Sequence, residues 1–164
     1  MAILKLQIFG RDVPSSDDIW QLYSQIIQTP ELWKMETFKE AATKCGLRKI
    51  AARRGYFSFF GKHHVTGQAP IVGGFIEEIR LFIGEEPKDL PEALYKKDCG
   101  KLGQIASEYS ARFRQKLGEP RMAHDNDIFE YNDHRVRVLP TGCIWVVISK
   151  LSVLKQLPND WWAP

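Results

Sequence analysis

Hydrophobic and polar residues alternate along much of this chain, which is the period-2 pattern of a half-buried β-strand. The alternation is found in four segments: residues 3–9, 75–83, 128–131 and 135–139. Residues 47–60 are also expected to form a strand or a hairpin, because their second half is rich in aromatic residues, which fill a pleated surface well. Residues 143–148 are apolar at every position, as in a central strand that is covered on both faces.

Apolar residues recur at steps of three and four in other segments, which is the helical pattern. It is found in residues 19–27, 33–45 and 102–117. The first helix is expected to begin at Ser15 or Ser16, whose side chain can cap the free backbone N–H groups of its first turn. Thr29 and Pro30 predict that a second helix starts immediately afterwards, and Gly46 predicts its end.

The order of these elements, β-α-α-β-β-α-β-β-β, predicts an α+β fold with a mixed, mainly antiparallel sheet and helices packed largely on one face. Residues 61–74 are expected to form a loop, and residues 132–134 a tight turn between two strands. Residues 151–164 are expected to form a short helical turn and a docked tail. No repeat or linker divides the sequence, so we predict one globular domain over residues 1–164.

Composition supports a folded domain, since 44% of the 164 residues are hydrophobic and 26% are charged. No run of about 18 apolar residues occurs, so no membrane span is expected. The amino-terminal segment is too short and polar for a secretory signal, and the three cysteines form no C-x-x-C pair. We therefore expect a cytoplasmic protein.

Charge is distributed unevenly along the chain. Residues 41–76 contain six Lys or Arg residues and no acid, a local charge of +6, although the whole chain carries only +3. The remainder therefore sums to 3 − 6 = −3, with an acidic stretch between residues 77 and 92. Aromatic residues are interleaved with the cations at residues 56–60, and we expect this basic segment to gather on one outward-facing surface.

The basic segment allows two interpretations. Its cations could neutralise phosphates while Tyr56 and Phe57 stack on bases, which would make residues 44–64 a nucleic-acid-binding surface. Alternatively, Phe57 and Phe59 point into the core, and the cations only keep the edge of a sheet soluble. The sequence Arg54-Gly55-Tyr56 matches the start of an RNA-recognition motif, but the match fails at the next positions.

Candidate chemistry is sparse elsewhere. Neighbouring residues of an extended chain point in opposite directions, so the pair His63-His64 is poorly suited to bind one metal ion. The loop from His124 to His134 carries imidazoles and carboxylates, but their spacing matches no known ligand set. No nucleophile elbow or phosphate-binding loop is found. We therefore predict no catalytic residue, no metal site and no cofactor.

These observations favour a non-catalytic, cytoplasmic protein-binding module whose partner is another protein with an acidic surface. A small bacterial inhibitor or toxin-immunity protein, acting by steric occlusion of its partner, fits the size and the lack of motifs. Nucleic-acid binding is the alternative. The predicted contact residues are the cations and aromatic residues of the basic segment together with the paired tryptophans near the end: Arg48, Lys49, Arg53, Arg54, Tyr56, Lys62, His63, Trp161 and Trp162.

Overall fold

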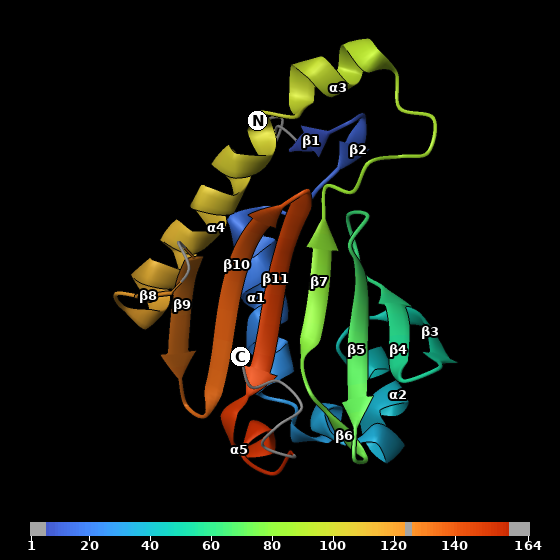
Figure 1. Cartoon of the computed structure of the whole chain (residues 1–164), viewed down its shortest axis with the longest axis vertical. Helices are drawn as coiled ribbons and strands as arrows, with labels where there is room; N and C mark the ends of the chain where they lie inside the picture. Colours follow the sequence, from blue (N-terminus) through green and yellow to red (C-terminus); the bar gives the residue numbers. More distant parts are fainter. Residues whose placement is uncertain (1–5, 124–125, 158–164) are drawn as a thin grey trace.

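A computed structural model of the chain, which describes residues 6–123 and 126–157, shows an antiparallel sheet with helices packed on one face (Figure 1). This confirms the predicted α+β class. Strands of the main sheet follow the order β3-β4-β5-β7-β11-β10-β9-β8, and β6 pairs with β5. Their bounds are β3 Arg48–Arg53, β4 Tyr56–Phe60, β5 Thr66–Val72, β6 Phe75–Ile76, β7 Ile79–Ile83, β8 Arg121–Ala123, β9 Asn126–Tyr131, β10 His134–Thr141 and β11 Cys143–Lys150.

The helices pack against the sheet from behind in the view of Figure 1, where α1 and α2 lie beneath the strands. Their bounds are α1 Ser16–Ile27, a 3-10 turn η1 Pro30–Trp33, α2 Met35–Lys44, α3 Glu92–Asp98, α4 Lys101–Leu117 and α5 Leu151–Leu154. Ser15 caps α1 in a reciprocal capping box with Asp18, as the sequence predicts. Phe113 of α4 contacts both Tyr23 of α1 and Phe129 of β9, so α4 covers the same face.

One hydrophobic core lies between the helices and this face of the sheet. Strand β11 supplies Ile144, Val146 and Ile148 to it and lies between β7 and β10, as expected of a central strand. From β4, Phe57 and Phe59 enter the core, and Phe57 stacks on Phe38 of α2 with ring centroids 4.7 Å apart. In the part of the chain that the structure describes, no helix is both long and apolar enough to cross a membrane.

The prediction of a loop at residues 61–74 is wrong, because residues 66–72 form β5. This strand pairs with β4 on one side and with β7 on the other. Its sequence contains Gly67 and Pro70, which are weak strand formers, and the two neighbouring strands supply the hydrogen bonds that stabilise it. Gly67 is required at its place, since a Cβ there would clash with the Phe59 ring and lie 2.7 Å from the Arg80 carbonyl oxygen.

The N-terminal part also differs from the prediction in detail. Within residues 3–9, only β1 Gln7–Ile8 is a strand, and it pairs with β2 Arg11–Asp12 in a separate two-stranded sheet. Residues 3–5 lie outside the described residues. The second predicted helix is divided into η1 and α2, because Lys34 is extended and bridges to Phe75. Helix α3, which is not among the predicted helices, precedes α4.

Candidate functional site

Cations of the basic segment gather at one edge of the sheet, on and around β3. Arg48 lies opposite Phe60 in the register of β3 and β4, and Arg53 lies opposite Tyr56. Since paired residues share a face, these four side chains project from the face opposite the core. Arg54 follows β3 directly, and Lys62 lies in the turn between β4 and β5; both are exposed. The expected outward-facing basic surface is therefore present.

These cations are not neutralised by the acidic stretch that follows them. Arg53 Nε donates to Ser58 Oγ at 3.4 Å, an Arg48 guanidinium N–H donates to the Gly61 carbonyl at 3.5 Å, and Lys49 Nζ lies 5.6 Å from the centroid of the Phe60 ring. Among the described residues, no ion pair joins the basic segment to any acid between residues 77 and 92.

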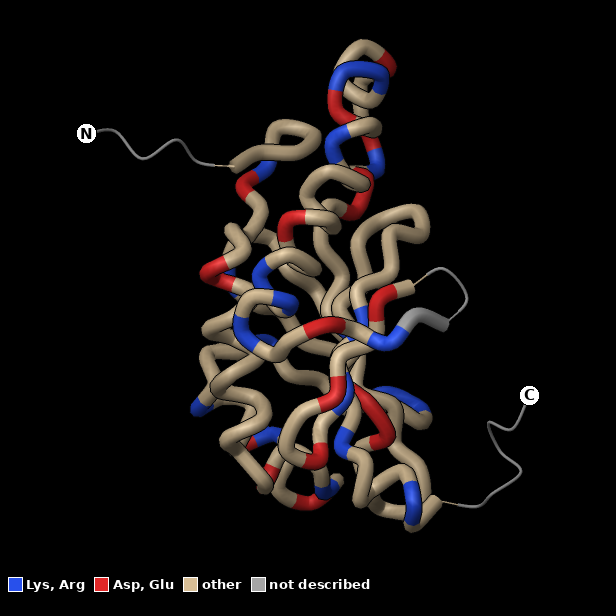
Figure 2. Tube along the Cα trace, turned by 90° about the vertical axis from the view of Figure 1, so that its left-hand side faces the viewer, with Lys and Arg blue, Asp and Glu red and all other residues tan. Residues whose placement is uncertain are grey.

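The acids of residues 77–92 bind other groups. Glu78 pairs with Arg80 at 2.5 Å and with Arg137 at 3.4 Å, and Glu85 accepts a hydrogen bond from the Thr66 hydroxyl at 2.6 Å. Figure 2, turned by 90° about the vertical axis from Figure 1, shows basic and acidic residues interspersed along α3 and the region below it. The run of cations without acids on and around β3 differs from this mixed distribution.

Aromatic side chains continue the basic surface across the sheet. Phe60 pairs with Thr66, Thr66 pairs with Phe82, and Phe82 pairs with Trp145, so these residues form one row on the face that α1, α2 and α4 leave uncovered. Phe82 and Trp145 meet edge to face with centroids 4.9 Å apart. Phe60 is 44% exposed. A shallow depression of about 490 Å³ lies along this row.

We call this surface the basic aromatic face. It consists of Arg48, Lys49, Arg53, Tyr56, Phe60, Phe82 and Trp145. The predicted contact residues include the first four, and Phe60 lies in the aromatic run at residues 56–60, whereas Phe82 and Trp145 are absent from the prediction. The signal for Phe82 lies in the alternation of residues 75–83, which places this aromatic side chain on the same, more polar face as Arg80.

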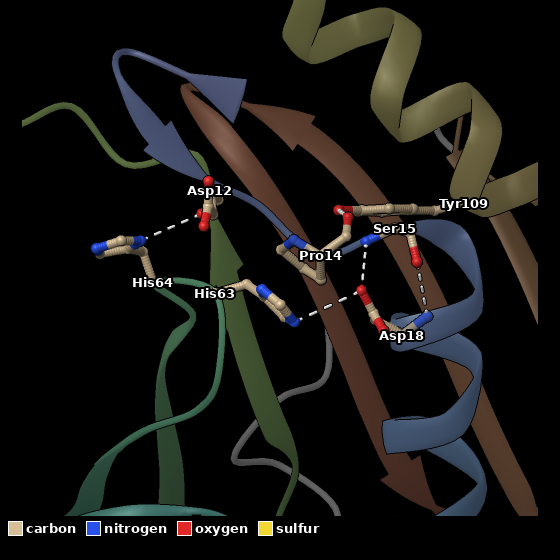
Figure 3. A network of polar contacts seen from close by, with 7 residues as sticks. All are labelled: Asp12, Pro14, Ser15, Asp18, His63, His64 and Tyr109. Atoms are coloured by element: carbon tan, nitrogen blue, oxygen red, sulfur yellow. Dashed lines mark hydrogen bonds and ion pairs between the residues drawn. The ribbon is translucent and has the colours of Figure 1, made fainter. Parts of the chain in front are cut away.

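Two histidines lie at the turn between β4 and β5 and contact the N-terminal part of the chain (Figure 3). His63 Nε2 is 3.7 Å from Asp18 Oδ2 at the start of α1. His64 Nδ1 is 3.2 Å from the carbonyl oxygen of Asp12 in β2. The imidazoles thus have different partners, and the described residues contain no group of three or more His, Cys, Asp or Glu side chains that could hold a metal ion.

Several other candidate residues do not join this surface. Phe57 is 8% exposed and belongs to the core, so the prediction that it stacks on bases is wrong. His134 is buried and its ring bonds to the Asn132 carbonyl at 2.7 Å, while the Asp133 carboxylate accepts from the backbone and hydroxyl of Ser152. Burial lowers the pKa of His134. His124, Trp161 and Trp162 lie outside the described residues.

Similarity to known proteins adds nothing to this geometry. No family model, no curated protein and no solved structure matches the chain. The functional argument therefore rests on the residues of the basic aromatic face and on their surroundings.

Proposed function

We propose that the chain is a non-catalytic, cytoplasmic protein-binding module, and that the basic aromatic face binds an acidic surface of another protein. The observation that supports this proposal is that Arg48, Lys49 and Arg53 lie on a helix-free face of the sheet beside the exposed Phe60 ring and the partly buried Tyr56 ring, and that among the described residues no acid of residues 77–92 is paired to them. The cysteines Cys45, Cys99 and Cys143 are free thiols, which is usual in a reducing compartment.

The composition of the face supports a protein partner. Cores of protein interfaces are enriched in Arg, Tyr, Trp and Phe, and a few such residues usually provide most of the binding energy. Phe60, Phe82 and Trp145 would supply the apolar contact, while Arg48 and Arg53 would pair with carboxylates at its margin. A positive surface also accelerates encounter with an acidic partner, so association is expected to depend on ionic strength.

Steric occlusion is the most specific form of this proposal. A partner enzyme whose acidic active-site region rests on the basic aromatic face would be closed to its substrate, as with a small bacterial inhibitor or toxin-immunity protein. No group on this chain would need to take part in chemistry.

The test uses the full chain as bait together with two charge-reversal variants. Arg53→Glu with Arg54→Glu changes the sign of charge at the face, whereas Lys96→Glu with Lys97→Glu makes the same change in net charge on α3. An acidic protein captured by the wild type and by the α3 variant, but lost from the Arg53 and Arg54 variant, would support the proposal.

Direct binding of the identified partner completes the test. We expect Phe60→Ala to weaken its affinity at least about tenfold. We also expect the association rate to fall about tenfold between roughly 50 and 300 mM salt. Equal binding by wild type and both charge variants, or capture that disappears after nuclease treatment, would contradict a protein partner at this face.

Single-stranded nucleic acid is the second candidate. The Tyr56 ring lies opposite Arg53, and the Phe60 ring lies opposite Arg48, on the face of the sheet that no helix covers. Rings beside cations are suited to stacking on bases and to pairing with phosphates. A labelled oligonucleotide would then bind at low salt, with affinity falling steeply as salt rises, and Phe60→Ala would weaken binding without changing that salt dependence.

A further inference from the structure

A second pocket overlaps one end of the basic aromatic face, with which it shares Arg48, Lys49 and Phe60. It has a volume of about 340 Å³ and is bounded by the β3 edge, the turn between β4 and β5, and β2. Its side chains come from Asp12, Arg48, Lys49, Phe60, His63 and His64. Four of these six can carry positive charge, and only Asp12 carries a carboxylate.

The cations of this pocket are available to a ligand. Arg48 makes one long bond to the Gly61 carbonyl at 3.5 Å, and the Lys49 ammonium lies over the Phe60 ring. Within residues 6–123 and 126–157, neither side chain forms an ion pair with a carboxylate. The guanidinium and the ammonium line one pocket, and both groups are usual partners of phosphate oxygens.

The tautomer of His64 follows from its contact. A carbonyl oxygen only accepts hydrogen bonds, so Nδ1 of His64 carries the proton that it donates to Asp12 O at 3.2 Å. The other ring nitrogen, Nε2, is therefore an acceptor in the neutral ring and becomes a donor when the ring is protonated. His64 would bind an anion only in the protonated state.

The backbone around the pocket adopts conformations that residues with a Cβ rarely adopt. Lys49, His63 and His64 have φ values of 52°, 59° and 59°, and these are three of the six non-glycine residues with positive φ in the described chain. Such conformations persist where the surrounding structure holds them, and they concentrate at ligand-binding sites. Here they hold both imidazoles between the turn and the N-terminal segment (Figure 3).

The charges around the pocket come from several elements. Arg48 and Lys49 line it together with Asp12, and the Asp18 carboxylate faces His63 from α1. Lys62 in the same turn and Lys44 at the end of α2 line the adjoining cavity with His63 and Asp18, and they add positive charge.

We propose that this pocket binds the phosphoryl group of a phosphate monoester. A tetrahedral dianion presents acceptor oxygens in several directions and can contact β3 and the histidine turn together, whereas a planar carboxylate would mainly engage one guanidinium. The proposal does not rest on the protein-binding function, because the isolated chain would bind the anion without a partner.

The experiment follows the imidazole signals of the full chain by NMR during titration with sodium sulfate and with inorganic phosphate, at constant ionic strength set by chloride. We expect saturable shifts of the His63 and His64 signals with both anions.

Two pairs of variants assign the effect to the pocket. Arg48→Gln with Lys49→Gln should abolish saturable binding. Lys96→Gln with Lys97→Gln is the control with equal loss of charge and should bind sulfate as the wild type does.

The outcome is decisive in either direction. Shifts that grow linearly with anion concentration, or saturable binding that survives the loss of Arg48 and Lys49, would overturn the proposal. Amide spectra of each variant establish that it is folded. A failure here would leave partner capture through Arg53 and Arg54 unaffected, so the two proposals are tested separately.

Discussion

Two phenylalanines three residues apart on β4 provide a strong test of the fold and of the basic aromatic face. Phe57 is 8% exposed and its ring stacks on Phe38 at 4.7 Å, whereas Phe60 is 44% exposed beneath the Lys49 ammonium. Truncation of a buried phenylalanine to alanine costs about 3–5 kcal/mol. We expect about 3 kcal/mol for Phe57→Ala, since β4 lies beside the edge strand β3, where the site can partly relax.

Phe60→Ala should cost far less. Its ring keeps much of its contact with water in the folded state, and the cation–π contact with Lys49 is worth about 0.5–1 kcal/mol at an exposed site. We therefore expect a loss of about 1 kcal/mol. The same substitution on one strand thus gives two different outcomes, and the difference depends only on which face each ring occupies.

Urea unfolding followed by tryptophan fluorescence measures both free energies, and thermal unfolding provides a check. At about 2–4 °C per kcal/mol, Phe57→Ala should lower Tm by about 6–12 °C and Phe60→Ala by about 2–4 °C. A larger loss for Phe60→Ala than for Phe57→Ala would refute the assignment of faces, because a register shift of one residue moves every side chain of a strand to the opposite face.

Three further substitutions test the packing and the buried ionisable groups. Gly67→Ala should lower the free energy of unfolding by about 2 kcal/mol, measured in urea, because the added methyl group meets the Phe59 ring. Burial lowers the pKa of His134 in the folded state. The contribution of the neutral imidazole to stability is therefore present above about pH 6.5 and is lost as the pH falls. The free energies of unfolding at pH 5 and pH 7.5 should differ less in His134→Gln than in the wild type. Burial and the neighbouring Glu78 raise the pKa of Glu77, so the contribution of Glu77 to stability is present at low pH and is lost as the pH rises through the folded-state pKa. Glu77→Gln should therefore be more stable than the wild type at pH 7.5, and this difference should vanish near pH 4. A stability difference that is the same at both pH values would contradict this reasoning.

Local patterns predicted the elements whose residues carry their own periodic signal. The cap at Ser15 and the apolar spacing after it identify α1, and the uniformly apolar residues 143–148 identify a strand inside the sheet. Both signals are local, because a cap acts within one helical turn and burial on both faces requires apolar residues on both sides.

Strand β5 could not be found in this way. Gly67 and Pro70 disfavour a strand by intrinsic propensity, and the hydrogen bonds that stabilise β5 come from β4 and from β7. Such pairing is a tertiary effect, and it overrides propensity without leaving a periodic pattern in the segment itself. The same limit applies to the row from Phe60 to Trp145, because its members come from four strands and meet only through the register.

Alternation along a strand assigns side chains to two faces, but it does not say which face the helices cover. Phe57 and Phe60 are equally apolar, and the sequence alone allowed Phe57 to be the exposed ring. The arrangement of α2 decides the question, because its Phe38 packs against Phe57 and Phe59. Packing between distant segments therefore determines which aromatic residue is available for binding.

The surroundings of the cations at the β3 edge distinguish protection of the edge from recognition. An unpaired edge strand needs charge to deter association with another strand, and lysine in particular serves that purpose. Residues 41–76 contain six cations and no acid, and three of the cations lie beside aromatic rings on the uncovered face. Edge protection explains the cations of β3 but not the aromatic rings that lie beside them on the uncovered face. A negatively charged ligand explains both, which is why we propose binding at the basic aromatic face and at the pocket that His63 and His64 line.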